Sequence, residues 1–264
     1  MQKYWTPIKS GIGNAVNKIL EPLGCELVSL RQAQPPPGTL YRPIGNIRLF
    51  LEDIQARGLP CRGVIDVGAN KGDWTRMALS VFPESNYLMI EPQQEMADTL
   101  NSLCRKHRNL TCVIAGAGKQ EGELLQTIYK DPRGSTFLPS TDEARLRGGV
   151  QRKTKILTLD AIISRHQFEP SLVKLDVQGF ELEVLGGAQS CFGTTEVFIL
   201  ETSLYQLYEA MPTTREVIAF MAEKDYELYD ITEFLRRPYD GALGQIDLAF
   251  AKKSGFLRNS NRWA

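Results

Sequence analysis

The stretch that decides the fold is VIDVGANKG, residues 64–72. Its first four residues form a short apolar run that ends at Gly68, a pattern typical of a buried parallel strand. Gly68 and Gly72 allow the backbone to turn sharply and allow a ligand to approach where no Cβ stands in the way. The loop then opens a helix, whose first amides favour a negatively charged group such as a carboxylate. We therefore expect a strand–loop–helix unit that binds a ligand.

On both sides of this unit, apolar runs alternate with helical patterns. Strands are predicted at residues 64–67, 87–90, 110–114, 172–177, 196–201, 226–231 and 245–251, with a strand fragment and a short helix over 156–164. Helices are predicted at residues 47–57, 75–82, 94–107, 180–189 and 214–224. This alternation implies an α/β fold with a mostly parallel, doubly wound sheet. The last two strands are joined by a loop that contains Pro238 and Gly241, so they are predicted to be antiparallel.

Two segments stand outside this rhythm. Apolar residues recur at helical spacing between Ile8 and Leu20, which predicts an N-terminal amphipathic helix. That helix either covers an edge of the core or acts as a lid or an arm of a homodimer. Residues 116–150 are glycine-rich and polar without a clear period. They are expected to form a long irregular excursion or a short hairpin, and long loops in compact domains are usually functional.

Composition excludes several classes of protein. The chain has 31 basic and 31 acidic residues, so it lacks the positive charge of a dedicated nucleic-acid binder. Its five cysteines are scattered and form no C-x-x-C pair, which argues against a zinc site or a disulfide framework and favours a reducing cytosol. We find no signal-peptide pattern and no apolar run of about 18 residues that would span a bilayer. A soluble, cytoplasmic protein is expected.

The residues that follow the first two strands indicate which cofactor the unit binds. Asn70 stands where the dinucleotide fingerprint has its second glycine, and a pyrophosphate needs that close approach, so NAD and FAD are disfavoured. Glu91 ends the second strand about 20 residues after the loop, the separation expected for an acid that binds a ribose diol. S-adenosylmethionine (SAM) has a ribose and no pyrophosphate, and it therefore fits both observations.

At this point the sequence resembles a known family. Residues 64–72 resemble the first motif of class I SAM-dependent methyltransferases, in the form that the FkbM family has. The stretches TLD (158–160), VKLDVQGFE (173–181) and VLGGA (184–188) are similar to further signatures of that family. The resemblance spans roughly residues 45 to 205. One departure is Gln178, where the family often has an acid.

The resemblance implies a Rossmann-like sheet of about seven strands with an antiparallel final strand, and it implies SAM as the cofactor. It also implies roles for residues at the ends of the strands. The loop would lie against the amino-acid end of SAM, Glu91 would hold the ribose, and residues after the second and third strands would flank the adenine. The implied cofactor-binding residues are Asp66, Gly68, Ala69, Asn70, Gly72, Trp74, Thr75, Glu91, Pro92, Gln93, Ala115, Gly116 and Asp176.

Four polar residues are predicted to surround the transferred methyl group. Alternation along a strand places Lys174 and Asp176 on the same face, near its carboxyl end. Glu181 follows at the start of the next helix, where capping the helix or binding the backbone is an alternative role, and Glu201 ends the fifth strand. Asp176 is the first choice for a base or substrate anchor, with Lys174 as its ion-pair partner or a catalytic group. Magnesium takes carboxylate ligands, so a magnesium site formed by Asp176 and Glu201 is an alternative, but no spacing pattern specifies a metal site and none is predicted.

The function expected from these observations is SAM-dependent methyl transfer, with S-adenosylhomocysteine (SAH) as the product. The resemblance implies that the acceptor is a hydroxyl oxygen of a sugar, a glycan or a secondary metabolite. Methylation of a nitrogen or a carboxylate, and a scaffold that has lost catalysis, are the alternatives. Residues 44–254 are expected to form the methyltransferase domain, residues 1–43 an extension or lid, and residues 255–264 a tail.

Overall fold

The computed structural model describes residues 42–138 and 149–261. The described helices and strands belong to one compact unit that begins at Ile44. The helix expected between Ile8 and Leu20 lies outside the described residues.

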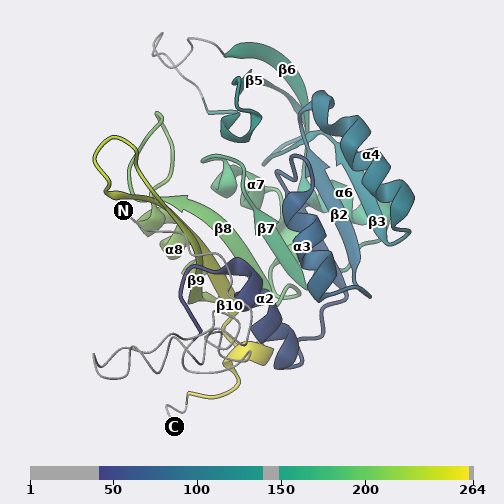
Figure 1. The fold of residues 1–264 in the computed structure, drawn as a ribbon, viewed down its shortest axis with the longest axis vertical. Coiled ribbons are helices and arrows are strands. Elements are labelled where there is room, and N and C mark those ends of the chain that lie inside the picture. Colours follow the sequence, from purple (N-terminus) through teal and green to yellow (C-terminus); the bar gives the residue numbers. More distant parts are fainter. Residues whose placement is uncertain (1–41, 139–148, 262–264) are drawn as a thin grey trace, which may run out of the picture. The chain divides into compact units, whose positions relative to one another are not determined.

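A seven-stranded sheet with the order β3-β2-β1-β7-β8-β10-β9 is the centre of this unit (Figure 1). Its strands are β1 (Gly63–Val67), β2 (Asn86–Glu91), β3 (Leu110–Ile114), β7 (Leu172–Leu175), β8 (Val197–Ser203), β9 (Tyr226–Arg236) and β10 (Leu243–Lys252). Neighbouring strands are parallel except that β10 is antiparallel to both β8 and β9. The predicted fold class, including the reversed final strand, is confirmed.

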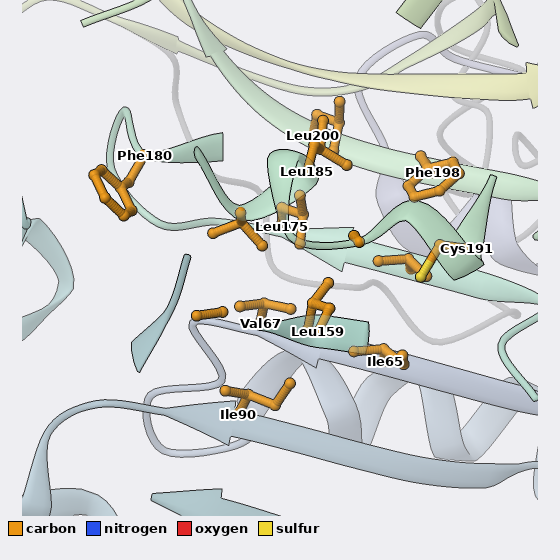
Figure 2. Packing of buried hydrophobic residues seen from close by; sticks show 14 of the residues in the cluster. Ile65, Val67, Ile90, Leu159, Leu175, Phe180, Leu185, Cys191, Phe198 and Leu200 are labelled. Atoms are coloured by element: carbon orange, nitrogen blue, oxygen red, sulfur yellow. The ribbon is translucent and has the colours of Figure 1, made fainter. Parts of the chain in front are cut away.

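Helices cover both faces of the sheet (Figure 1). One face packs against α2 (Ile47–Ala56), α3 (Asp73–Val81) and α4 (Ala97–Lys106). The other packs against α6 (Leu159–His166), α7 (Glu181–Gly186) and α8 (Thr214–Glu223). Figure 2 shows Val67, Leu159 and Leu175 in the core between the sheet and α6, α7 and α8, where each is almost completely buried. Strands buried on both faces explain why the sequence shows apolar runs here and no strict alternation.

Several helices begin where a side chain satisfies a free backbone amide. Asn46 accepts a hydrogen bond from the Leu49 amide at the start of α2, at 3.0 Å, and Thr158 accepts one from Ala161 at the start of α6, at 3.1 Å. Thr213 and Glu216 form a reciprocal capping box at the start of α8. By contrast, α3 follows Gly72, which is in the left-handed conformation and provides no side-chain cap. The start of that helix therefore lacks the side-chain cap that the other three have.

The structure differs from the sequence prediction in the bounds of some elements. The strand predicted at 172–177 ends at Leu175, because the chain then turns through Gln178, whose φ is +55°. The predicted helix at 180–189 is divided into α7 and the 3-10 turn Gln189–Cys191, and the one at 94–107 begins with the 3-10 turn Gln94–Met96.

The excursion at 116–150 contains more regular structure than an irregular loop. Strands β4 (Gly116–Ala117), β5 (Gly122–Ile128) and β6 (Val150–Leu157) form a second sheet with the order β4-β6-β5. Between β5 and β6 lies the 3-10 turn η3 (Pro132–Gly134). We call residues 131–138 the η3 segment; residues 139–148 lie outside the described residues.

Candidate active site

The sheet order reverses between β1 and β7, and a cavity of about 560 Å³ opens at the carboxyl ends of the strands there. Ligands of open α/β sheets bind at such a point. Residues from the loop after β1, the end of β2, β4, the η3 segment, the end of β7 and strands β8 to β10 line this cavity. The site is therefore built from segments that are distant in sequence.

A row of charged side chains crosses four adjacent strands on the face covered by α2 and α3. Asp66 on β1 pairs in register with Lys174 on β7, and Glu201 on β8 pairs with Asp247 on β10. Val64, Leu172, Ile199 and Ala249, two residues away on the same strands, belong to the apolar core of that face. Because side chains alternate along a strand, the charged residues lie on the same face, where the core gives way to the cavity. We call Asp66, Lys174, Glu201 and Asp247 the charged row.

Lys174 is the positive centre of this region, with a side chain only 6% exposed. Its Nζ atom lies 3.0 Å from Asp176 Oδ2 and 3.9 Å from Asp66 Oδ1. Burial alone lowers the pKa of Lys174, but the charges of Asp176, Asp66 and Asp247 outweigh that effect and raise it. Lys174 therefore stays protonated, and it balances only part of the surrounding negative charge.

Asp66 lies behind the cavity and is 1% exposed. Thr75, at the first turn of α3, donates a hydrogen bond to Asp66 Oδ2 at 2.6 Å. Burial raises the pKa of Asp66, an effect that Lys174 and Thr75 oppose. Asp66 and Thr75 thus fasten the start of α3 to β1, and neither lines the cavity.

Gln178 joins the carboxyl groups of Asp176 and Glu201. Its Nε2 atom donates to Asp176 Oδ1 at 3.1 Å and to Glu201 Oε2 at 2.7 Å. The other Glu201 oxygen accepts a hydrogen bond from Gln245 Nε2 on β10, at 3.2 Å. The left-handed conformation of Gln178, which costs about 1 kcal/mol or more in a residue other than glycine, directs its side chain between the two acids.

The environments of these two acids separate their pKa values. Burial tends to raise the pKa of Asp176, but Lys174 and the hydrogen bonds from Gln178 and Glu201 lower it overall. Burial, together with the charges of Asp176, Glu181 and Asp247, raises the pKa of Glu201 well above its usual value. Two acids that share a site in this way divide into one that stays ionised and one that holds a proton.

Glu181 has a structural position below the cavity. It is 2% exposed, and its Oε1 atom accepts hydrogen bonds from the amides of Val177 at 3.1 Å and Gly179 at 3.2 Å. Burial raises its pKa to about 7. Glu181 does not line the cavity; it holds the loop that carries Gln178, which is the backbone-binding role weighed against catalysis from the sequence.

Glu91 lines the cavity at the end of β2 and is 2% exposed. It accepts hydrogen bonds from the amide of Asn70 at 2.8 Å and from that of Gln93 at 2.9 Å. Gln93 in turn donates to the carbonyl oxygen of Pro132 at 3.0 Å, which ties this corner to the η3 segment. One acid thus fixes both the glycine loop and the segment that follows β2.

The two glycines of the loop serve the packing of the chain itself. A Cβ on Gly68 would lie 1.9 Å from the carbonyl oxygen of Asp176, and one on Gly72 would lie 3.0 Å from Leu103 of α4. Both have positive φ values, +81° and +75°. The absence of a Cβ therefore makes room for the neighbouring backbone and for α4, and the expected approach of a ligand at these glycines stays a prediction.

Trp74 contributes a polar atom that the protein leaves unpaired. Its Nε1 atom is buried and has no hydrogen-bond partner in the part of the chain that the structure describes. Trp74 lines the cavity at the start of α3, with Lys174 Nζ 5.7 Å from its ring centre. A buried donor without an acceptor is costly, so this N–H is suited to an acceptor atom of a ligand.

The structure brings most of the sequence-predicted site residues to one cavity. Those that line it are Gly68, Ala69, Asn70, Trp74, Glu91, Pro92, Gln93, Gly116, Lys174, Asp176 and Glu201. Five others lie behind its walls: Asp66, Gly72, Thr75, Ala115 and Glu181.

Several lining residues were not predicted. They include Lys71, Asp73, Gln126, Asp131, Pro132, Arg133, Gly134, Ser135, Phe137, Leu235 and Gln245. Most belong to the η3 segment or the β9–β10 hairpin, and no motif in the sequence marks them. The length of the excursion is the one sequence signal that points toward the η3 segment. Gln178 stands out in the sequence only as a departure from the family pattern.

Two further features concern metals and membranes. Among residues 42–138 and 149–261, no cluster of three or more His, Cys, Asp or Glu side chains is arranged to hold a metal ion. Over the same residues, no helix has both the length and the apolar character needed to cross a bilayer.

The sheet order, with one reversed strand and a cavity at the switch point, defines a Rossmann-like α/β fold. Residues 66–228 match the family model described as the methyltransferase FkbM domain. The match covers more than half of the chain, and the protein therefore belongs to the FkbM methyltransferase family.

Among solved structures, the chain is similar to methyltransferase FkbM from Methylobacillus flagellatus KT, with 17% identity and a TM-score of 0.45, over 71% of this chain and 43% of that one. It thus spans less than half the length of that protein. It is also similar to a precorrin-6y C5,15-methyltransferase from Geobacter metallireducens GS-15, with 12% identity and a TM-score of 0.42, over 78% of this chain and 87% of that one. A third similar structure is Aeropyrum pernix fibrillarin in complex with SAM, with 12% identity and a TM-score of 0.41, over 82% of this chain and 72% of that one. No curated protein matches the chain.

Proposed function

We propose that the protein is a SAM-dependent methyltransferase that methylates a hydroxyl oxygen of a sugar, a glycan or a secondary metabolite. The observation that carries the proposal is the cavity that joins Glu91 and the glycine loop to Lys174, Asp176 and Glu201. One end offers contacts suited to a nucleoside, and the other offers ionisable groups suited to a proton transfer.

The residues at the first end fit SAM. The unpaired N–H of Trp74 and the uncapped start of α3 suit the carboxylate of an amino acid. Glu91 retains lone pairs for the hydroxyls of a ribose while it binds the two loop amides. Ile90 and Phe137 provide apolar walls for a base. When bound, SAM supplies an electrophilic methyl carbon attached to a positively charged sulfur.

The residues at the second end suit a neutral hydroxyl acceptor. Asp176 has a side chain that is 37% exposed, so it can bind a substrate, and Lys174 keeps it ionised. The surplus of acids over the buried Lys174 disfavours a carboxylate acceptor, which would add a further negative charge. The largest contribution of these groups would be to hold the acceptor oxygen in line for attack.

The wider organisation of the chain is part of the proposal. We assign residues 44–254 to the methyltransferase domain, residues 1–43 to an extension or lid and residues 255–264 to a tail. A second copy of the chain, in a homodimer, is a proposed partner. The four cysteines of the described residues are all free, which agrees with an enzyme of the reducing cytosol.

Calorimetric titration of the purified protein with SAH, and separately with NAD, tests the cofactor. We expect micromolar binding of SAH and no heat from NAD, since the loop lacks the second glycine of the dinucleotide motif. If a folded sample binds NAD, or binds neither ligand, the proposal is wrong. A hydroxyl acceptor can then be sought by incubating the enzyme with labelled SAM and panels of sugars, glycans and metabolites.

A further inference from the structure

The charged row and the acids beside it carry more acidic groups than Lys174 can balance. Asp66, Asp176, Glu201 and Asp247 surround Lys174, and Glu181 lies beneath them. On the remaining elements packed against this region, Glu233 of β9 faces Asp247. Such a cluster keeps at least one proton at neutral pH. The question is which acid holds it and what removes it.

Hydrogen bonding distinguishes the two acids that line the cavity. Asp176 has one oxygen on the ammonium group of Lys174, at 3.0 Å, and the other on Gln178. Glu201 has no cationic partner within hydrogen-bond distance in the described residues; its two oxygens contact the neutral amides of Gln178 and Gln245, at 2.7 and 3.2 Å. An ammonium group stabilises an ionised carboxylate more strongly than an amide does. The proton shared by the pair therefore resides on Glu201.

We propose that Glu201, held between the amides of Gln178 and Gln245, is the general base of the reaction, and that the positive charge of bound SAM removes its stored proton. This inference rests on the proposed function. It reverses the expectation from the sequence, in which Asp176 was the first choice. Asp176 is instead the fixed anion of the site, and Gln178 and Gln245 are positioning residues.

The chemistry balances with these groups alone. Binding of the cation releases the proton of Glu201 to solvent. The acceptor oxygen then forms its bond to the methyl carbon and gives its own proton to Glu201, while the C–S bond breaks and its electron pair stays on sulfur. The charge on sulfur is lost in the same step, which restores the conditions under which Glu201 holds a proton. A base with a pKa near the working pH is the most effective kind.

Proton release on binding can be measured without knowing the acceptor. Titration of SAM into the protein, in buffers that differ in ionisation enthalpy, gives the number of protons released, and the measurement is repeated across about pH 5 to 9. We expect the wild type to release up to about one proton per bound SAM, and Glu201→Gln to lose that release while still binding SAM. The amino group of SAM titrates near pH 8 and contributes equally to both proteins, so their difference belongs to Glu201.

Asp247→Asn is the matched control. Burial raises the pKa of Asp247 to about 7, and it pairs with Glu201 in the sheet, but it does not line the cavity. We expect proton release to persist in Asp247→Asn, shifted to lower pH because one negative neighbour of Glu201 is gone. If release disappears in this variant and persists in Glu201→Gln, the stored proton is on Asp247 and the inference is wrong.

Gln245→Leu provides a second test that leaves Glu201 in place. Loss of an amide that stabilises the ionised form of Glu201 should shift the pH of maximal release upward. An unchanged pH profile would contradict the positioning role. If the proposed function is wrong, SAM itself does not bind. If SAM binds but no proton release is linked to Glu201, only the present inference is overturned.

Discussion

Glu91 Oε2 accepts a hydrogen bond from the backbone amide of Asn70 at 2.8 Å, so the acid at the end of β2 holds the loop that follows β1. The same carboxyl group accepts from Gln93 at 2.9 Å and remains open to the cavity. The fixing of the loop and the proposed contact with a ribose therefore depend on one side chain.

Replacing Glu91 with alanine is expected to weaken SAH binding by about 10- to 100-fold. Two amides lose their acceptor, a cost of about 1 to 3 kcal/mol, and the ribose contact is lost as well. Isothermal titration calorimetry measures the change. The control is Glu95→Gln, which removes only a surface ion pair with Arg152 (2.8 Å) outside the cavity and should leave SAH affinity unchanged. Equal affinities for Glu91→Ala and the wild type would remove Glu91 from the cofactor site.

Replacing Lys174 with methionine is expected to reduce the free energy of unfolding by about 3 to 5 kcal/mol, because Asp66 and Asp176 lose their cation and Asp66 is 1% exposed. Urea denaturation followed by circular dichroism measures the loss. The double variant Lys174→Met with Asp66→Asn should recover part of it, since the buried negative charge is then also removed. A double variant no more stable than Lys174→Met would show that the Asp66 charge is not what destabilises the single variant.

Glu181 predicts a dependence of stability on pH. Its pKa is about 7 in the folded protein and about 4.3 in an unfolded chain. The folded state therefore binds the extra proton between these values, and Glu181 makes the free energy of unfolding fall as pH rises through that window, by up to about 1.4 kcal/mol per unit. Below the window its contribution is fully present, and above about pH 7 it is lost.

Denaturation curves at several pH values test this expectation in Glu181→Gln. Glutamine keeps an oxygen that can accept from the Val177 and Gly179 amides but does not titrate, so the decline with pH should be shallower in the variant. Glu183→Gln, an exposed position on the same helix, should follow the wild type. A slope in Glu181→Gln equal to that of the wild type would assign the effect to other groups.

Gly68→Ala is expected to disrupt the site because the new Cβ would lie 1.9 Å from the Asp176 carbonyl oxygen, at a φ of +81°. Gly193→Ala separates the two causes, since Gly193 has a φ of +82° and a Cβ added there would meet no atom within 4 Å in the described part of the chain. We expect about 1 kcal/mol of destabilisation at Gly193 from backbone strain alone. Gly68→Ala should lose substantially more, together with SAH binding. Similar losses at both positions would show that the contact with Asp176 relaxes easily.

The fold could be predicted from the sequence because the parallel strands are buried on both faces and form apolar runs between helices. The loop at Gly68 and the acid Glu91 could also be found, since both follow strands directly. The contact between Glu201 and Gln178 could not be predicted, because it depends on how β7 and β8 are aligned and on the left-handed turn at Gln178. The η3 segment and Gln245 reach the cavity only through the tertiary fold, and no local pattern marks them.

The charged row has a consequence for how the chain folds. Its members meet only if β1, β7, β8 and β10 pair in one particular register. A shift of β7 by a single residue would turn Lys174 toward α6 and α7 and leave Asp66 without its cation. Misaligned chains would therefore carry an isolated acid in an apolar layer, and the charged row penalises incorrect strand pairing during folding.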